Sequence, residues 1–342
     1  MPYTSLGKLG SGFFGEVFLE RDDGLNRLCA AKYLRVGGPD RFAEAQAMLA
    51  VEHENIVKVF SADDDAATGK VIIRMEFHTN GSLQDIQAGR PENVGIVVRR
   101  IEQACRGLQH LHNDGRLHRD IKPANMLVSD NGSIKLSDFG LCLPAVAVGA
   151  SPPMGYVAHL PPEAITGPGE ISDVAGDIFA MGVTLRRLME GDGHLKSMRA
   201  SGANVMQAIV DGKFPSPRFA PHIHDKLRRV ARKATHFDPS RRFASASEMR
   251  HALEQARPRV AWSVSSPTPG VIVWDGIGDD GTEWRSCMET DAHRRSSFLA
   301  EKRLPGKSLR QQHALDAIGL NGSDAYKHAC SALGGVAEGA IT

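Results

Sequence analysis

The pattern of hydrophobic and polar residues changes twice along the chain. Up to about residue 78, short runs of β-branched and apolar residues are separated by glycine or polar turns, a pattern that indicates strands. Beyond that point, apolar residues recur every three or four positions, as on one face of an amphipathic helix. The expected strands are 3–19, interrupted by a glycine turn, 28–32 and 71–78; the expected helices begin near residue 41 and cover 94–112, 204–210, 225–235 and 246–256.

After Arg257 the pattern changes again. Short strand-like segments at 262–264, 271–274 and 283–288 precede two helical stretches, at about 308–318 and 323–333. All three tryptophans lie in this tail, which indicates a small folded core rather than a linker. We therefore expect a first domain at 1–257, with parts at about 1–78 and 79–257, and a small accessory α+β domain at 258–342 whose role the sequence does not reveal.

Composition and charge narrow the classes of function. Of the 342 residues, 42% are hydrophobic, and 41 Lys and Arg residues nearly balance 40 Asp and Glu residues. The net charge of +1 gives no general attraction to nucleic acid or to an anionic membrane. The longest apolar run, 141–150, is about half the length that a membrane helix needs. We see no secretion signal before the first motif.

The cysteines point to the same setting. Five are present, scattered and without a Cys-x-x-Cys pair, so we expect reduced thiols, no zinc site and a cytoplasmic location. A homodimer is possible but nothing in the sequence indicates one. Six basic residues cluster in the tail, where we favour a solvated edge over a phosphate or partner patch: Arg294, Arg295, Lys302, Arg303, Lys307 and Arg310.

Two polar motifs stand out against this background. The first is His118-Arg119-Asp120-Ile121-Lys122-Pro123-Ala124-Asn125, and thirteen residues after Asn125 follows Asp138-Phe139-Gly140. The first motif would place an acid, a lysine and an asparagine on one short loop, and a neighbouring turn could bring a second acid to a metal shared with the asparagine. Phosphoryl transfer needs such a set: a carboxylate that orients a hydroxyl, oxygen ligands for Mg²⁺, and cations that spread developing charge.

A glycine-rich turn near the N-terminus fits the same chemistry. Residues 10–17, Gly-Ser-Gly-Phe-Phe-Gly-Glu-Val, match Gly-x-Gly-x-x-Gly-x-Val, and glycine lets the backbone approach phosphates closely. A dinucleotide-binding turn of similar pattern should open a helix at its third glycine. Here the chain continues as a strand after Gly15, which favours a different nucleotide-binding turn.

With these motifs in order, the chain resembles the eukaryotic-type (Hanks-type) Ser/Thr protein kinases over about three-quarters of its length, and its composition favours a bacterial member. The resemblance implies an α+β, two-lobed fold with a small β-rich N-lobe and a larger helical C-lobe. It also implies ATP and Mg²⁺ (Mn²⁺ is possible) as cofactors, and phosphorylation of serine or threonine on protein substrates, including autophosphorylation. The alternative is a pseudokinase-like nucleotide-binding scaffold that acts through the tail. Such proteins commonly lose at least one of four residues that are all present here, Lys32, Asp120, Asn125 and Asp138.

The resemblance also assigns roles to single residues. Asp120 would orient the acceptor hydroxyl, Lys122 would neutralise the transferring phosphoryl group, and Asn125 with Asp138 would ligate Mg²⁺. Lys32 would bind the phosphates and pair with Glu44, or with Glu52 as second choice. The ATP-binding residues would be Leu9, Val17, Ala30 and Leu127 around adenine, the backbone of Glu76 and His78 at the hinge beyond a gatekeeper Met75, and Gly10, Gly12 and Gly15.

Further residues would organise the C-lobe. Asp177 would brace the catalytic loop, and Glu163 of Pro161-Pro162-Glu163 would pair with Arg242. Either Tyr156 stands where the family usually has a threonine before that Glu, or two to three residues have been inserted there, which puts the acceptor geometry in doubt. Arg119 is typical of kinases that receive a phosphate from the activation segment, yet Ser151 is the only Ser or Thr between Leu141 and Leu160. Two hypotheses stay open: a phosphoserine switch at Ser151, or ordering by apolar packing of Val146 and Val148, which we favour.

Overall fold

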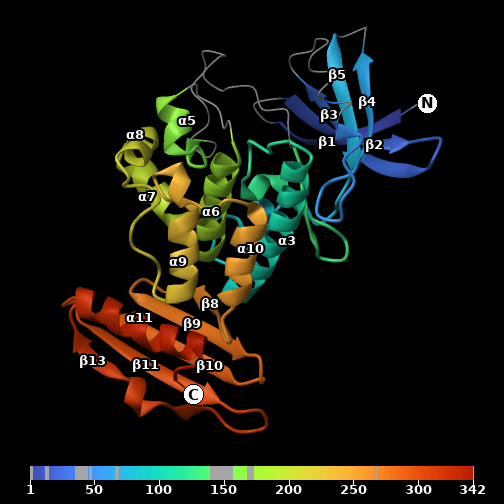
Figure 1. The fold of residues 1–342 in the computed structure, drawn as a ribbon. Helices are drawn as coiled ribbons and strands as arrows, with labels where there is room; N and C mark the ends of the chain where they lie inside the picture. Colours follow the sequence, from blue (N-terminus) through green and yellow to red (C-terminus); the bar gives the residue numbers. More distant parts are fainter. Residues whose placement is uncertain are drawn as a thin grey trace.

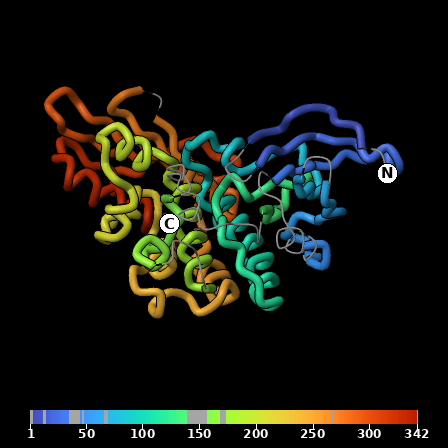
Figure 2. The backbone as a smooth tube through the Cα atoms, turned by 90° about the horizontal axis from the view of Figure 1, so that it is seen from above, coloured from blue at the N-terminus to red at the C-terminus, as the bar shows by residue number. Residues whose placement is uncertain are grey.

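The computed structural model describes residues 3–11, 15–34, 45, 48–65, 69–138, 157–167, 173–266 and 268–341. These residues form three successive bodies (Figure 1): an N-terminal sheet, a helical lobe and a C-terminal sheet with one helix. The view from above in Figure 2 also shows the N-terminal sheet and the C-terminal sheet on opposite sides of the helical lobe.

The N-terminal lobe is a five-stranded antiparallel sheet in the order β1-β2-β3-β5-β4. Alternation of side chains places Ala30 and Lys32 of β3 on one face, opposite Met75 and Ile73 of β5. Ala45 and Met48, at the predicted helix, are helical and buried against this sheet's core. The strands are β1 (Tyr3–Ser11), β2 (Gly15–Asp22), β3 (Arg27–Leu34), β4 (Val59–Asp65) and β5 (Lys70–Glu76).

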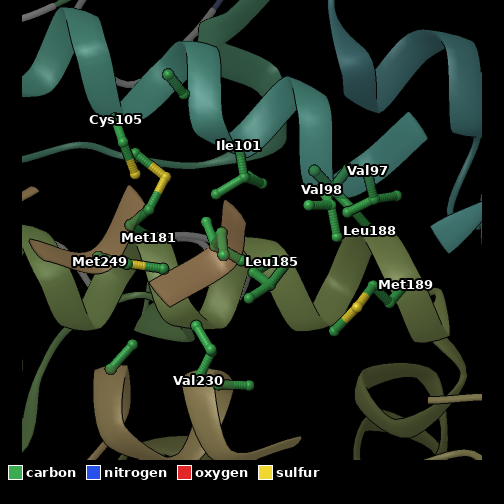
Figure 3. Close-up of a cluster of buried hydrophobic side chains, with 14 of the residues drawn as sticks. Val97, Val98, Ile101, Cys105, Met181, Leu185, Leu188, Met189, Val230 and Met249 are labelled. Carbon is green, nitrogen blue, oxygen red and sulfur yellow. The ribbon is translucent and has the colours of Figure 1, made fainter. Parts of the chain in front are cut away.

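The helical lobe is built around α6 (Val174–Glu190), most of whose residues are buried. Asp173 caps its start by accepting a hydrogen bond from the Gly176 amide at 2.9 Å. Figure 3 shows apolar side chains of α3 (Val94–Asn113), including Ile101, pointing towards Leu185 and its neighbours on α6. The other elements are α2 (Leu83–Gln87), η1 (Pro123–Asn125), β6 (Met126–Val128), β7 (Ile134–Leu136), α5 (Pro162–Thr166), α7 (Gly193–Ala200), α8 (Val205–Val210), α9 (Asp225–Ala234), η3 (Pro239–Arg241) and α10 (Ala246–Gln255).

The tail is an antiparallel sheet covered on one face by α11 (Gly322–Glu338) (Figure 1). Trp262, Trp274 and Trp284 form its core together with apolar residues of α11, and the Trp262 indole N–H donates to the Leu333 carbonyl at 3.1 Å. The strand order is β12-β11-β10-β9-β8, with β13 also paired to β11. Its elements are β8 (Val260–Ser265), β9 (Val271–Gly278), β10 (Glu283–Thr290), β11 (Ser296–Arg303), β12 (Arg310–Gln311), η4 (His313–Leu315) and β13 (Ala317–Leu320).

One predicted helix of the tail is wrong. Residues 308–318, expected to be helical, contain β12, a 3₁₀ turn and the start of β13. Both strands pair with β11, so their backbone groups find partners across the sheet instead of within a helix. The strand β11 itself was not predicted. Pairing between distant segments therefore overrode a local pattern that resembled helical spacing.

The tail is fixed to the helical lobe at the N-terminus of α3. The Asn93 side chain caps α3, because its oxygen accepts from the amides of Gly95 (3.0 Å) and Ile96 (3.2 Å). Its amide nitrogen donates to the Ala261 carbonyl and to Ser263 Oγ, both at 3.1 Å, on the edge strand β8. The Asn93 side chain thus provides hydrogen-bond partners both for amides at the start of α3 and for the edge strand β8.

Further contacts extend this junction. Glu102 of α3 is buried, and both of its carboxylate oxygens accept hydrogen bonds from Arg257, which directly precedes the tail. On α11, the Tyr326 hydroxyl donates to the Phe219 carbonyl at 2.5 Å. Two more polar pairs lie along the same face, Arg228 with Cys330 (3.2 Å) and His224 with Glu338 (3.3 Å). In the part of the chain that the structure describes, no helix is long and apolar enough to cross a membrane.

The close approach at Gly95 gives a test of this junction. A Cβ at Gly95 would lie 2.8 Å from the Ala261 Cβ, so Gly95→Ala should overpack the contact and lower the free energy of unfolding by about 1–3 kcal/mol. Helix propensity alone would predict a gain of up to about 1 kcal/mol. Ala261→Gly removes the opposing methyl group, so the double variant should recover most of the loss. Urea denaturation of the four proteins measures the coupling, and purely additive changes would contradict the contact.

Candidate active site

A buried carboxylate, that of Asp177, fixes the loop that carries Asp120. Asp177, in the first turn of α6, is fully buried and accepts hydrogen bonds from the amides of His118 and Arg119, both at 2.8 Å. His112 Nε2, near the end of α3, lies 2.9 Å from the same carboxylate. Arg119 has φ of 68°, a left-handed conformation that is costly for a non-glycine residue. The bond from Asp177 to the Arg119 amide stabilises this conformation.

Two further side chains converge on Asp120. Lys122 Nζ lies 2.6 Å from Asp120 Oδ2, and Asn125 Nδ2 donates to the same oxygen and to the Asp120 carbonyl, both at 2.8 Å. The 3₁₀ turn η1, which begins at Pro123, brings Asn125 back towards Asp120. Asp120 and Asn125 are each only 6% exposed. The loop therefore presents a carboxylate whose orientation is set by a cation and by an amide.

Asp138 follows directly after the hairpin of β6 and β7. The Ser137 amide donates to the Asn125 carbonyl at 3.0 Å, which places the backbones of these two segments side by side. Lys32 Nζ, from the N-terminal sheet, lies 2.9 Å from Asp138 Oδ1. Burial alone would raise the pKa of Asp138, but the Lys32 ammonium, and then Lys122, hold that pKa below its ordinary value. Asp138 also has a left-handed backbone, with φ of 60°.

The predicted adenine-binding residues are only partly gathered. Val17 and Leu127 pack against the buried cluster that contains Ala30 and Met75. Leu9 is 47% exposed on β1.

Two glycines of the predicted glycine-rich turn lie in the sheet. Gly10 is paired with Val17 across β1 and β2, and Gly15 lies against β3, where a Cβ would be 2.2 Å from the Tyr33 carbonyl oxygen. Only glycine fits at position 15, because any side chain would collide with the neighbouring strand.

Comparison with known proteins agrees with this arrangement. Residues 3–254 match the family described as protein kinase domain. The chain belongs to the protein kinase family. The predicted two-lobed kinase fold is thereby confirmed, and the C-terminal sheet region is present beyond it.

The kinase domain has relatives in several bacteria. The chain is 30% identical over 300 residues to the serine/threonine-protein kinase PknJ of Mycobacterium tuberculosis, which covers 81% of this chain and 49% of that protein. It is 32% identical over 265 residues to PknA of Corynebacterium glutamicum (73% and 55%) and 28% identical over 266 residues to PrkC of Bacillus subtilis (74% and 40%). The chain thus spans about half the length of the curated relatives it matches.

Some predicted residues of the kinase site lie outside the described residues. These are Gly12, Glu44 and Ser151, together with Tyr156 and the apolar run 141–150. Glu52, the second choice as partner of Lys32, lies instead on the surface beside Lys58, with Nζ and Oε1 2.5 Å apart. Among the described residues, the acid that contacts Lys32 is Asp138.

The hinge contains an ionic contact that the sequence did not indicate. Glu76 and His78 were expected to act through their backbones, but the Glu76 carboxylate lies 3.0 Å from His78 Nε2 and 3.1 Å from Lys135 Nζ of β7. It also accepts from the Lys58 amide at 3.1 Å. Burial would raise the pKa of Glu76, yet the contact with His78 and the hydrogen bond from Lys135 lower it to about 2. Glu76 therefore connects the N-lobe, the hinge and the C-lobe.

Arg242 and Glu163 form the pair that the resemblance implied. Arg242 is 4% exposed, and its guanidinium donates to both oxygens of Glu163, at 2.6 and 2.8 Å. It also donates to the carbonyls of Ala175 (3.0 Å) and His236 (2.8 Å). The pair joins α5 to the start of α6 and to the segment before η3, so it fixes the residues that follow the activation segment.

Removal of Glu163 should therefore cost stability. Glu163→Gln leaves a buried guanidinium without its carboxylate, and we expect the free energy of unfolding to fall by roughly 2–4 kcal/mol. Glu248→Gln is the matched control, because Glu248 pairs with Lys233 at 2.6 Å with both side chains more than 40% exposed. That control should change stability by less than about 1 kcal/mol. Equal losses in the two variants, measured by urea denaturation, would show that the buried pair is not special.

The lowered pKa of Glu76 predicts a change in the acid response. A carboxylate with a folded-state pKa of about 2, against 4.5 as its ordinary value, contributes stability that is present above about pH 4.5 and lost as the pH falls towards 2. Glu76→Gln removes this contribution, so its stability relative to the parent should be lowest near neutral pH and approach the parent as the pH falls to 2. Denaturation curves between pH 7 and 2 measure this difference; a difference independent of pH would contradict the assignment.

Proposed function

We propose that this chain transfers the γ-phosphoryl group of ATP to serine or threonine hydroxyls of protein substrates. The observation that carries the proposal is the convergence of Lys122 and Asn125 on Asp120, beside the ion pair of Lys32 with Asp138. The relatives named above, which are serine/threonine-protein kinases, support it. Lys122 favours Ser/Thr rather than tyrosine acceptors in the family that the motifs resemble.

The site residues fit a magnesium-bound nucleotide. The amide nitrogen of Asn125 donates to Asp120, so its side-chain oxygen is the atom that could bind a cation. The lowered pKa of Asp138 keeps its carboxylate ionised. Mg²⁺ prefers one or two such oxygen ligands together with phosphate oxygens and water. When bound, Mg²⁺·ATP supplies the phosphoryl group and neutralises part of its charge. Mn²⁺ would fit the same oxygen ligands.

Four side chains of the protein have separate roles in the transfer. Asp120 accepts a hydrogen bond from the acceptor hydroxyl, orients its oxygen towards the phosphoryl group, and takes the proton late in the reaction. Lys122, held 2.6 Å from Asp120, is placed to offset charge that develops on the transferring group. Lys32 is placed to hold the nucleotide's phosphates from the N-lobe side. Asp177 positions the loop through its two amide contacts.

Several finer predictions still rest on the sequence alone. In the family that the motifs resemble, a bulky residue at the position of Leu141 is associated with serine acceptors, so we expect serine to be preferred over threonine. The choice between a Ser151 switch and apolar ordering concerns the same segment, and both positions lie outside the described residues. The cytoplasmic location, the absence of a nucleic-acid partner and the possible homodimer also stay predictions.

Substitution of Asp120 tests the proposed function. Asp120→Asn keeps the shape of the side chain but removes the charge that orients and deprotonates the hydroxyl, so transfer from labelled ATP with Mg²⁺ to a protein acceptor should fall about 10²–10⁴-fold. Asp114→Asn, an exposed carboxylate shortly before the loop, should retain activity. Circular dichroism should show both variants folded. A parent protein that binds ATP yet transfers no more phosphate than Asp120→Asn would establish the nucleotide-binding scaffold instead.

A further inference from the structure

A cavity of about 190 Å³ lies beside the C-terminal half of α6, between α7 and the loop at 214–218. It would hold several water molecules at about 30 Å³ each, so it has room for the end of a side chain. Its apolar wall includes Leu195 and Phe214, and its polar lining includes Arg187, His194 and Arg218. An apolar wall with a few converging polar groups is typical of a binding pocket.

The acids near this cavity are already neutralised by neighbouring arginines. Glu190 accepts from the Arg186 guanidinium at 2.8 Å and, through its other oxygen, from the Ala220 amide at 2.7 Å. Arg187 pairs with Asp192 through two hydrogen bonds, at 2.7 and 2.9 Å. Glu190 and Asp192 are thus each paired with an arginine. Neither acid is left to neutralise a further cation at the cavity.

The remaining positive charge of the cavity belongs to Arg218, with His194 beside it. Arg218 is exposed at the rim of the cavity, and no ion pair of its guanidinium with another described residue is present. Its carbonyl accepts from Arg186 at 2.8 Å, which fixes the backbone from which the side chain projects. His194 stacks on Phe214, with ring centroids 5.9 Å apart and planes 10° apart. A cation on a fixed backbone therefore faces an opening with an apolar wall.

The cavity also touches the segment that follows the activation segment. Arg187 Nη1 lies 3.3 Å from Nε2 of His159, which is four residues before Glu163. Arg187 is ten residues after Asp177 on α6, or about 15 Å along the helix axis. An extended peptide covers that distance in about four or five residues, at roughly 3.3 Å each. Because Asp177 contacts the amides of His118 and Arg119, directly before Asp120, the cavity is within reach of a substrate peptide whose hydroxyl lies at Asp120.

We propose that this cavity binds a carboxylate side chain of the protein substrate, four or five residues from the phosphorylated hydroxyl. Arg218 pairs with the carboxylate, and the wall at Leu195 and Phe214 contacts the methylene groups of a glutamate. The proposal rests on the proposed function, because it assumes that a peptide lies across the catalytic loop. It adds a preference for acidic sequences, which neither the motifs nor the catalytic geometry determines.

Binding of fluorescent peptides tests the cavity without requiring phosphoryl transfer. Each peptide carries one serine and either Glu or Gln at one position up to six residues away, and anisotropy is measured with a non-hydrolysable ATP analogue and Mg²⁺. Because Glu and Gln have the same shape, their difference reports charge. We expect Glu to bind at least about tenfold more tightly than Gln at one position four or five residues from the serine.

Charge reversal at Arg218 identifies the residue responsible. Arg218→Glu should abolish the preference for Glu and favour a Lys peptide at the same position, whereas Arg218→Lys should keep part of it. Arg229→Glu, an exposed charge reversal on α9, is the matched control and should leave the preference intact. An unchanged preference in Arg218→Glu, or no preference at any position in the parent, would overturn the proposal. Discrimination between peptides without any transfer activity would instead refute the proposed function and leave the cavity's role standing.

Discussion

The arrangement of the catalytic loop depends on one buried carboxylate. Asp177 has no solvent to compensate its charge, so the amides of His118 and Arg119 and the His112 ring must do so. A buried charge that needs these donors also fixes where they lie, and Asp120 follows them directly in the chain. The same bonds hold Arg119 in a backbone conformation that it would otherwise avoid. The position of Asp120 is thus set by the burial of Asp177 in the first turn of α6.

The remaining site residues are held by contacts between the lobes. Lys32 reaches Asp138 from the N-terminal sheet, and Glu76 links the hinge to Lys135 of β7. Each contact places one partner in the sheet and the other in the helical lobe. Movement of one lobe relative to the other must therefore change both distances together, that between Lys32 and Asp138 and that between Glu76 and Lys135. Binding of the proposed nucleotide and the geometry of the proposed metal ligands, Asn125 and Asp138, are for this reason expected to be coupled.

Residues that act through their own type and spacing could be predicted from the sequence, whereas a distant partner could be named only where the family resemblance supplied it, as it did for Glu163 and Arg242. Asp120, Lys122 and Asn125 lie within one short loop, so their spacing alone brings them together. Lys135 and Glu76 are 59 positions apart, and nothing in the local pattern of either residue indicates the other. His112 ended a predicted helix, which was the one available signal, but its contact with Asp177 required the packing of α3 on α6. The same limit explains the tail, where strand pairing with β11 replaced a predicted helix.

The junction with the tail bears on where the kinase domain ends. Arg257 precedes the predicted boundary, and it pairs with Glu102, which is buried on α3. A chain cut before Arg257 would leave that carboxylate buried without its cation, whereas a cut after it would retain the pair. The predicted boundary at 257/258 would therefore keep this ion pair within the first domain. The tail still contributes to the lobe, because Asn93 joins β8 to the start of α3, and the opposite end of α3 carries His112 against Asp177. The helix that supports the catalytic loop is in this way anchored at both ends, once by the tail and once by the loop's own brace.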